Sequence, residues 1–158
     1  MTIREMRPEE TDVLNDFLFL AIFIPEGVTP PSRDILEKPE LKVYVDCFGF
    51  LYGDNCLVAE EDGKIVGACW TRIMDDYGHV DNNTPSFAIS LYPEFRGRGI
   101  GTKLMEEMLK LLKEQGYQKA SLAVQKANYA VSMYRKVGFE TVDENEEEFI
   151  MVCDLTKI

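Results

Sequence analysis

The sequence predicts an α/β fold (α+β) in which helices lie on both faces of a mixed sheet. Short apolar runs of strand length alternate along the chain with longer segments whose apolar residues repeat at helical spacing. Breaks rich in Gly, Pro and polar residues separate these segments. The length of 158 residues is close to the commonest size of one domain, so we expect a single domain over residues 1–158.

The first third of the chain predicts one strand followed by helical segments. Residues 2–6 can form the strand, and Pro8 suits the first turn of a helix. A break rich in Pro and Gly covers residues 25–31. Ser32 then stands where it could cap a second helical stretch, which is interrupted at Pro39.

The middle of the chain predicts a hairpin and a further strand. Apolar runs at 56–59 and 65–70 flank Asp62-Gly63, a dipeptide favoured in turns where both central residues need a positive φ. A polar loop follows, and residues 86–91 then form another apolar run of strand length. This last run leads directly into a glycine-rich segment.

The last third of the chain predicts two helices and three strands. An apolar stripe repeats at helical spacing from Ile100 to Leu112, and Gly116 is a natural cap for its end. The remaining predicted elements are a strand at 120–124, a helix over 130–137 that Gly138 closes, and strands near 139–142 and 148–155.

Composition narrows the class of function. The net charge of -11 argues against a nucleic-acid partner, because neutralising phosphates requires a basic surface. The chain opens without a secretory signal or a membrane-spanning apolar run, so we expect a cytoplasmic protein with no membrane partner. The four cysteines lack the short spacing of metal or redox pairs. We therefore expect no metal site, and reduced cysteines in the core.

The stretch from Leu91 to Thr102 joins a strand to the strongest predicted helix. Its glycines let a ligand approach the backbone, and the first amides of a helix have no partner within the helix. Those N–H groups and the helix dipole form an anion site, to which Arg96 and Arg98 add positive charge. A diphosphate fits this site. The alternative is a tight structural turn with solvated arginines.

The spacing excludes two common phosphate loops. Leu104 stands where a dinucleotide fingerprint has its third glycine, and the order Gly101-Thr102-Lys103 does not match the end of a Walker loop. A nucleotide-phosphate binder that uses this turn alone remains an alternative at this point.

Two motifs resemble those of the GNAT family of N-acetyltransferases. The run from Arg96 to Gly101 matches the family's Gln/Arg-x-x-Gly-x-Gly/Ala motif. The run from Asn128 to Phe139 is similar to its second signature, in which Asn and Ala precede a Tyr and Gly-Phe follows. The order and separation of the two motifs also fit. The resemblance covers residues 56–155 well and residues 2–20 loosely, while residues 21–52 match nothing general.

The resemblance implies a fold and a cofactor site. The fold is the family's mostly antiparallel mixed sheet, splayed between its fourth and fifth strands, with acetyl-CoA as co-substrate in the split. Ile89, Ser90 and Leu91 would pair with the pantetheine arm as an added strand would. The backbone amides over Gly97, Arg98, Gly99, Ile100, Gly101 and Thr102, beside Arg96, would hold the pyrophosphate. Asn128 would hydrogen-bond the cofactor, and Tyr134 would stand near the thioester sulfur.

The resemblance also implies the chemistry. Acetyl transfer by direct attack in a ternary complex needs a neutral amine, a donor to the developing oxyanion and a proton for the departing thiolate. The backbone amide near Leu91 is the family's oxyanion donor. Tyr134, as a phenol, is the candidate general acid, although its place on the apolar stripe of its helix also suits a core aromatic.

The general base is not assigned by the sequence. Strand residues 86–91 contain no carboxylate, unlike the same strand in some family members. Glu26, Asp75, Asp76 and His79 are the candidates, each able to act directly or through water.

The predicted function is an N-acetyltransferase with a small-molecule or peptide amine as acceptor. An acyl-CoA-binding sensor on the same fold is the alternative, supported by the missing strand carboxylate. We expect residues 21–52 to form the acceptor pocket, with Glu26 and Tyr44 as candidates for specificity and Phe23, Ile24 and Phe48 around a Pro-rich break. The alternative for this segment is a plain helical cover over the sheet. The oligomeric state is left open, with a homodimer as one option.

Overall fold

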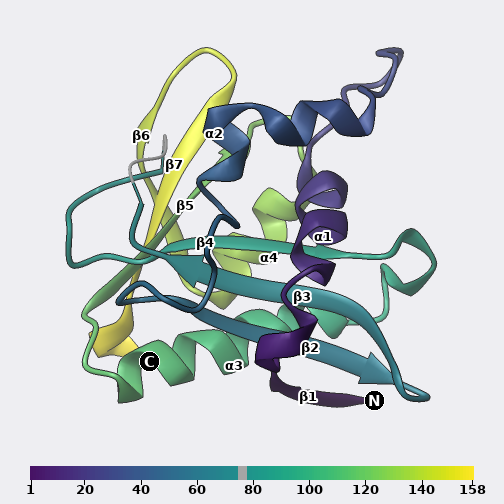
Figure 1. The fold of residues 1–158 in the computed structure, drawn as a ribbon. Helices are drawn as coiled ribbons and strands as arrows, with labels where there is room; N and C mark the ends of the chain where they lie inside the picture. The colour runs from purple at the N-terminus through teal and green to yellow at the C-terminus, as the bar shows by residue number, and fades with distance from the viewer. Residues whose placement is uncertain (75–77) are drawn as a thin grey trace.

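The structure, a computed structural model, describes residues 1–74 and 78–158. Its described part forms a seven-stranded sheet with helices on both faces (Figure 1). The strands are β1 (Thr2–Glu5), β2 (Asn55–Glu61), β3 (Lys64–Arg72), β4 (Ser86–Leu91), β5 (Lys119–Gln125), β6 (Phe139–Glu144) and β7 (Glu148–Asp154). The helices are α1 (Val13–Ala21), α2 (Pro39–Lys42), α3 (Ile100–Glu114) and α4 (Ala130–Val137), and the short 3-10 helix η2 (Arg33–Glu37) precedes α2. Over the described ranges no helix combines the length and apolar character needed to cross a membrane.

The sheet is mixed, mostly antiparallel and splayed in the middle, as predicted. The strand order is β1-β2-β3-β4-β5-β7-β6, and β4 and β5 are the parallel neighbours. These two strands are in register at a single pair, Ser86 with Ser121, whereas β3 and β4 pair from Gly67↔Leu91 to Arg72↔Ser86. The amide of Ser121 also donates to the carbonyl of Pro85 at 2.9 Å. Beyond this point β4 and β5 diverge, which opens a gap in the sheet.

The strands bury apolar side chains on both faces because helices cover both. In β2, Leu57 and Ala59 pack in the cluster that includes α3 and α4, whereas Cys56 and Val58 pack in the cluster that includes α1. This alternation follows from the two-residue repeat of a strand. In Figure 1, α1 crosses in front of β3 and β4, while α4 lies behind β4. The segments that follow β4 and β5 at the gap lead into α3 and α4, respectively.

The strands and helices predicted from local signals are confirmed, except that two of the helical stretches expected near the N-terminus begin as 3-10 helices. The stretch after Ser32 forms η2, which ends before α2 begins at Pro39, and the Ser32 side chain makes no cap hydrogen bond. The hairpin turn uses Asp62 (φ 52°) and Gly63 (φ 77°), the positive values that the dipeptide predicts. The helix expected from Pro8 instead forms a 3-10 turn over Pro8–Glu10, and α1 begins at Val13. The Glu10 carboxylate accepts two hydrogen bonds from Arg4 at 2.9 Å, which holds this short turn against β1.

The expectation that all four cysteines lie in the core is wrong for one of them. Cys56, Cys69 and Cys153 are buried and free, as the apolar surroundings predict, but Cys47 is exposed. Cys47 lies in a turn with φ 52°, so its backbone leaves the helical path there and its side chain reaches solvent. Burial raises the pKa of the Cys153 thiol to about 11, and it also raises the pKa values of Cys56 and Cys69.

Candidate active site

The glycine-rich turn forms an anion site at the start of α3. Gly97 (φ 77°) and Gly99 (φ 81°) occupy the left-handed region, which explains the need for glycine at both positions. Gly99 is the N-cap of α3, and its carbonyl accepts the first helical hydrogen bond from Lys103 at 3.2 Å. The amides of residues 100–102 therefore have no hydrogen-bond acceptor within the helix. They point out of its positive end. A phosphate group fits this arrangement.

A cavity of about 710 Å³ extends from this turn to the gap between β4 and β5. It is bordered by the end of α1, by β4, by the glycine turn and by α4. The sequence-predicted residues that line it are Ile89, Ser90, Leu91, Arg96, Gly97, Gly99, Gly101, Thr102, Asn128 and Tyr134. The structure thus brings most of the predicted cofactor residues to one cavity.

Two predicted residues, Arg98 and Ile100, do not line this cavity with their side chains. The guanidinium of Arg98 lies over the ring of Phe95, 5.2 Å from its centroid. The side chain of Ile100 is buried in the core, so its amide is the group available to a ligand. Arg96 does line the cavity and is exposed. It is thus the arginine of the motif whose charge borders the anion site.

The backbone of β4 presents hydrogen-bonding groups to the gap. The amide of Tyr92 donates to the carbonyl of Val66 at 3.0 Å, which sets the alternation of the antiparallel β3–β4 pair. With that alternation, Ile89 and Leu91 direct their N–H and C=O groups away from β3 and toward β5. Because β5 has diverged at this level, those groups face the gap. A Cβ at Gly67 would lie 2.1 Å from Leu91 Cδ2, so this glycine permits the position of Leu91.

Asn128 and Tyr134 border the gap from the side of α4. The Asn128 side-chain oxygen accepts a hydrogen bond from the amide of Ala130 at 2.9 Å and so caps the helix, which leaves its amide nitrogen for other partners. The Tyr134 ring packs edge-on against Phe139, with centroids 6.2 Å apart, and its side chain is almost fully buried. Burial raises the pKa of Tyr134 above that of an ordinary phenol. The hydroxyl therefore holds its proton at neutral pH.

A second cavity, of about 310 Å³, lies on the α1 and α2 side of the gap. Its described lining residues are Leu18, Ala21, Ile22, Phe23, Leu41, Tyr44, Phe87, Ala88, Ile89, Leu122, Ala123, Val124, Gln125, Asn128, Tyr134 and Glu148. Ile89, Asn128 and Tyr134 line both cavities. The two spaces therefore adjoin at the divergence of β4 and β5, where one ligand could meet another.

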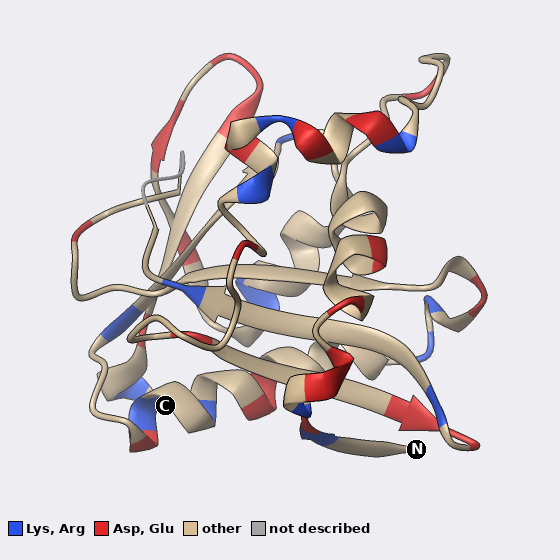
Figure 2. Cartoon of the chain, viewed as in Figure 1, with Lys and Arg blue, Asp and Glu red and all other residues tan. Residues whose placement is uncertain are grey.

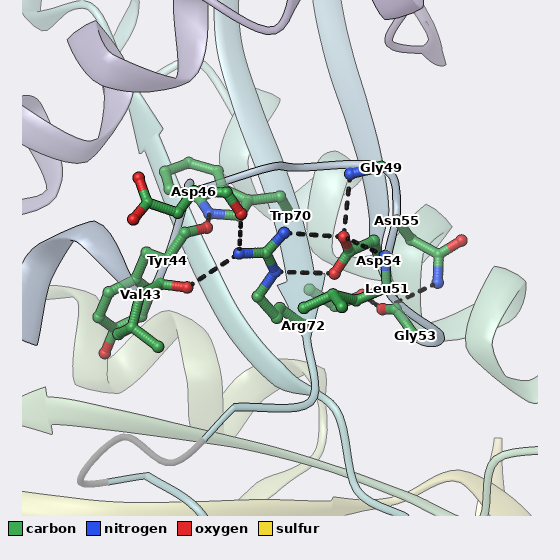
Figure 3. A network of polar contacts seen from close by, with 11 residues as sticks. Val43, Tyr44, Asp46, Gly49, Leu51, Gly53, Asp54, Asn55, Trp70 and Arg72 are labelled. Carbon is green, nitrogen blue, oxygen red and sulfur yellow. Dashed lines mark hydrogen bonds and ion pairs between the residues drawn. The ribbon is translucent and has the colours of Figure 1, made fainter.

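A buried polar network fixes the segment that carries Tyr44 (Figure 3). Arg72, on β3, forms an ion pair with Asp54 and also donates to the carbonyls of Val43 and Asp46. The indole N–H of Trp70 donates to the carbonyl of Tyr44 at 3.2 Å. The backbone on both sides of Tyr44 is thus tied to the sheet, and this positions one wall of the second cavity.

The candidate bases named from the sequence do not line either cavity where the structure describes them. Glu26 is exposed and lines neither cavity. His79 donates from Nδ1 to the carbonyl of Met74 at 2.8 Å and also lies outside both cavities. Asp75 and Asp76 lie outside the described residues. Sequence reasoning missed Glu148, which does line the second cavity, because it ends a run of acids that spans the turn between β6 and β7, and nothing local distinguishes it (Figure 2).

The acceptor segment expected over residues 21–52 divides between the two cavities and the core. Phe23 lines both cavities, Tyr44 lines the second and Ile24 lines the first. Phe48 is buried under Arg72, whose guanidinium lies 5.1 Å from its ring centroid. The segment therefore contributes to both spaces.

Comparison with known proteins assigns the family. A sequence model described as the acetyltransferase (GNAT) family matches residues 25–139, which is more than half of the chain. The chain belongs to the GNAT family of acetyltransferases. The match begins at residue 25, so the segment 25–52, which we expected to fall outside the family pattern, lies within it.

Two relatives named as acetyltransferases and one solved structure of the same fold are similar to this chain. A putative [ribosomal protein bS18]-alanine N-acetyltransferase of Bacillus subtilis is 31% identical over 94% of this chain and 92% of its own length. An acetyltransferase of Pectobacterium atrosepticum is 40% identical over 57% of this chain, and the match spans 60% of that relative. The crystal structure of an N-acetyltransferase from Thermoplasma acidophilum in complex with coenzyme A superposes with a TM-score of 0.68. That match has 22% identity and covers 97% of this chain and 98% of the other.

Proposed function

We propose that this GNAT protein transfers the acetyl group of acetyl-CoA to a primary amine in a ternary complex. The observation that carries the proposal is the meeting of two cavities at the gap between β4 and β5. One cavity contains the anion site of the glycine turn, and the other is bordered by the segment that carries Tyr44. Acetyl-CoA would occupy the first cavity and the acceptor amine the second.

The proposed cofactor contacts follow from the backbone. The free amides at the start of α3 and the side chain of Arg96 would bind the pyrophosphate, which carries negative charge. The groups of Ile89 and Leu91 that face the gap would pair with the amides of the pantetheine arm. The side-chain amide of Asn128 is not needed for the cap of α4, so it would donate to the cofactor.

The proposed chemistry uses two groups at the junction of the cavities. The N–H of Leu91 would donate to the thioester oxygen as negative charge develops there, because it lies at the edge that β5 leaves open. The hydroxyl of Tyr134 would give its proton to the departing thiolate. Burial raises the pKa of this phenol and would also raise the pKa of a coenzyme A thiol beside it, so burial of both groups together does not by itself make the proton transfer more uphill.

The acceptor is proposed as a primary amine in general. The Bacillus relative is named for acetylation of an alanine amine, and this supports an amine acceptor without fixing its identity. We further propose that no metal takes part. A cytoplasmic location stays a prediction, and the oligomeric state stays open.

Calorimetry and a release assay test the proposal. Acetyl-CoA should bind the purified protein and raise its melting temperature by mass action, with or without a chelator. Free coenzyme A should then appear when polyamines, amino acids, aminoglycosides or peptides with free N-termini are added. Binding without release for any amine would favour the sensor instead. A larger melting shift with NAD or ATP than with coenzyme A, or loss of binding in chelator, would overturn the cofactor assignment.

A further inference from the structure

The second cavity contains a carboxylate that the proposed chemistry has not used. Glu148 is the first residue of β7 and lines this cavity, and it is half-buried. Among the described residues of the cavity wall it is the one carboxylate, and no described side chain forms a hydrogen bond or ion pair with it. Partial burial without a cationic partner disfavours the charged form of this carboxylate, and an ammonium ligand would offset that cost.

The sheet register places Glu148 at the level of the proposed reaction. Ser86 on β4 pairs with Ser121 on β5, so four residues further along each parallel strand Ser90 and Gln125 stand at the same height. Gln125 pairs with Glu148 on β7. Glu148 therefore lies two strands away from the end of β4, across the gap, at the height of the groups that would hold the thioester.

The side chain of Glu148 also lies on the acceptor face of the sheet. Residues paired directly across two strands point to the same face. On β5, Leu122 and Val124 pack with α3 and α4, so Gln125 and its partner Glu148 belong to the opposite face, which α1 and α2 cover.

We propose that Glu148 binds the acceptor ammonium group and accepts its proton, which makes it a catalytic residue of the transfer. This inference rests on the proposed function. The ammonium gives one proton to the carboxylate, and the neutral amine attacks the thioester carbon. The C–N bond forms and the C–S bond breaks. The thiolate takes the proton of Tyr134, the second amine proton restores that hydroxyl, and Glu148 releases its proton to solvent.

The surroundings of Glu148 support this role. Burial raises the pKa of its carboxyl group, and the neighbouring Glu147 raises it further. A base becomes more effective as its pKa approaches the working pH. Tyr44 and Tyr134 are the other titratable side chains of the described cavity wall. Two cations beside the next residue of β7 face away from Glu148: Lys126 and Arg135 lie over the ring of Phe149, which packs on the opposite face.

The test compares Glu148→Gln with Glu147→Gln, which removes the same charge at the next residue, an exposed position. Acetyl-CoA affinity is measured by calorimetry for both variants and should stay within about twofold of the parent protein. Spermidine and a hexapeptide that begins with alanine serve as probes, titrated into each coenzyme A complex at pH 7. The better probe should bind Glu148→Gln about tenfold or more weakly, because a charge-assisted contact is lost, and Glu147→Gln normally.

Turnover of the same probe separates proton transfer from mere binding. Loss of a general base should lower kcat/KM by about 10²–10⁴-fold at pH 7. The deficit of Glu148→Gln should shrink as the pH approaches the pKa of the amine, because the neutral nucleophile then forms without help. A structural role would instead give a deficit that does not depend on pH.

The outcomes distinguish failure of the role of Glu148 from failure of the proposed function. If the parent protein binds acetyl-CoA and transfers acetyl groups while Glu148→Gln retains normal kcat/KM, the role of Glu148 is refuted and the proposed function stands. A pH-independent deficit, or equal deficits in the two variants, also refutes it. If the parent protein fails to bind acetyl-CoA, or releases coenzyme A with neither these probes nor any other amine of the panel, the proposed function fails at that step and the role of Glu148 falls with it.

Discussion

Arg72→Met tests whether the buried network holds the acceptor side of the site. The guanidinium donates twice to Asp54 at 2.8 Å and once each to the carbonyls of Val43 (3.1 Å) and Asp46 (2.6 Å). The side chains of Arg72 and Asp54 are 3% and 1% exposed. Removing one partner leaves a buried, unpaired charge, which costs about 3–5 kcal/mol. For a chain of this length, that corresponds to a melting temperature lower by roughly 6–20 °C.

Urea unfolding at pH 7 measures this cost against a matched control. Arg33→Met removes the same side chain from the Arg33–Asp16 pair, whose members are 56% and 48% exposed, and should cost less than about 1 kcal/mol. The double variant Arg72→Met/Asp54→Asn should regain part of the loss, because the unpaired charge is gone. Similar losses for Arg72→Met and Arg33→Met would refute the reasoning.

The same variant carries a functional expectation. Because Val43 and Asp46 flank Tyr44, loss of their contacts should loosen one wall of the second cavity while the glycine turn stays intact. We expect the acceptor KM of Arg72→Met to rise several-fold more than its dissociation constant for acetyl-CoA. Equal changes in both constants would indicate a general loss of structure.

Three further predictions address other parts of the molecule. Tyr134→Phe keeps the ring and removes the hydroxyl, so single-turnover acetyl transfer should slow by about 100-fold or more with little change in acetyl-CoA affinity; an unchanged rate would return this residue to a packing role. Gly101→Asp should weaken acetyl-CoA binding at least about tenfold in calorimetry, because it puts negative charge at the anion site. Gly101→Ala, whose Cβ would lie 3.3 Å from Met133 Sδ, is the steric control, and equal losses would exclude the charge effect. Glu10, whose carboxyl pKa the Arg4 guanidinium lowers to about 2, stabilises the fold above its unfolded pKa of about 4.5. In urea titrations, the free energy of unfolding of the parent should exceed that of Glu10→Gln by about 1–2 kcal/mol at pH 7, allowing for solvent screening. This difference should vanish as the pH falls toward 2. A difference that does not depend on pH would contradict the linkage.

The parts of the fold that the sequence predicts are those with local signals. The turn at Asp62-Gly63 and the helix ends at Gly116 and Gly138 depend on backbone preferences of single residues, and all three carry the expected positive φ. The network around Arg72 could not be predicted in this way. Its partners lie 18 to 29 residues away in sequence, and only the folded chain brings them together.

The contrast between local signals and contacts made only in the folded chain also applies to the candidate site. The cofactor side comes from two continuous stretches, 89–102 and 128–134, so its motifs are visible in the sequence. The acceptor side is assembled from the end of α1, the segment near Tyr44, the end of β5 and the start of β7. Glu148 joins that side only through the pairing of β5 with β7, and a shift of one residue in this register would turn it to the other face.

The burial of three of the four cysteines makes the protein suitable for a simple colorimetric measurement. Thiol reagents react with the thiolate, and Cys56, Cys69 and Cys153 are both enclosed and poorly ionised at neutral pH. Cys47 is the exposed thiol. Each acetyl transfer would liberate one coenzyme A thiol, so an aromatic disulfide reagent would record turnover above a background of about one reactive sulfur per chain. Cys47→Ser would remove even that background, and the native enzyme could be followed continuously without a radioactive label.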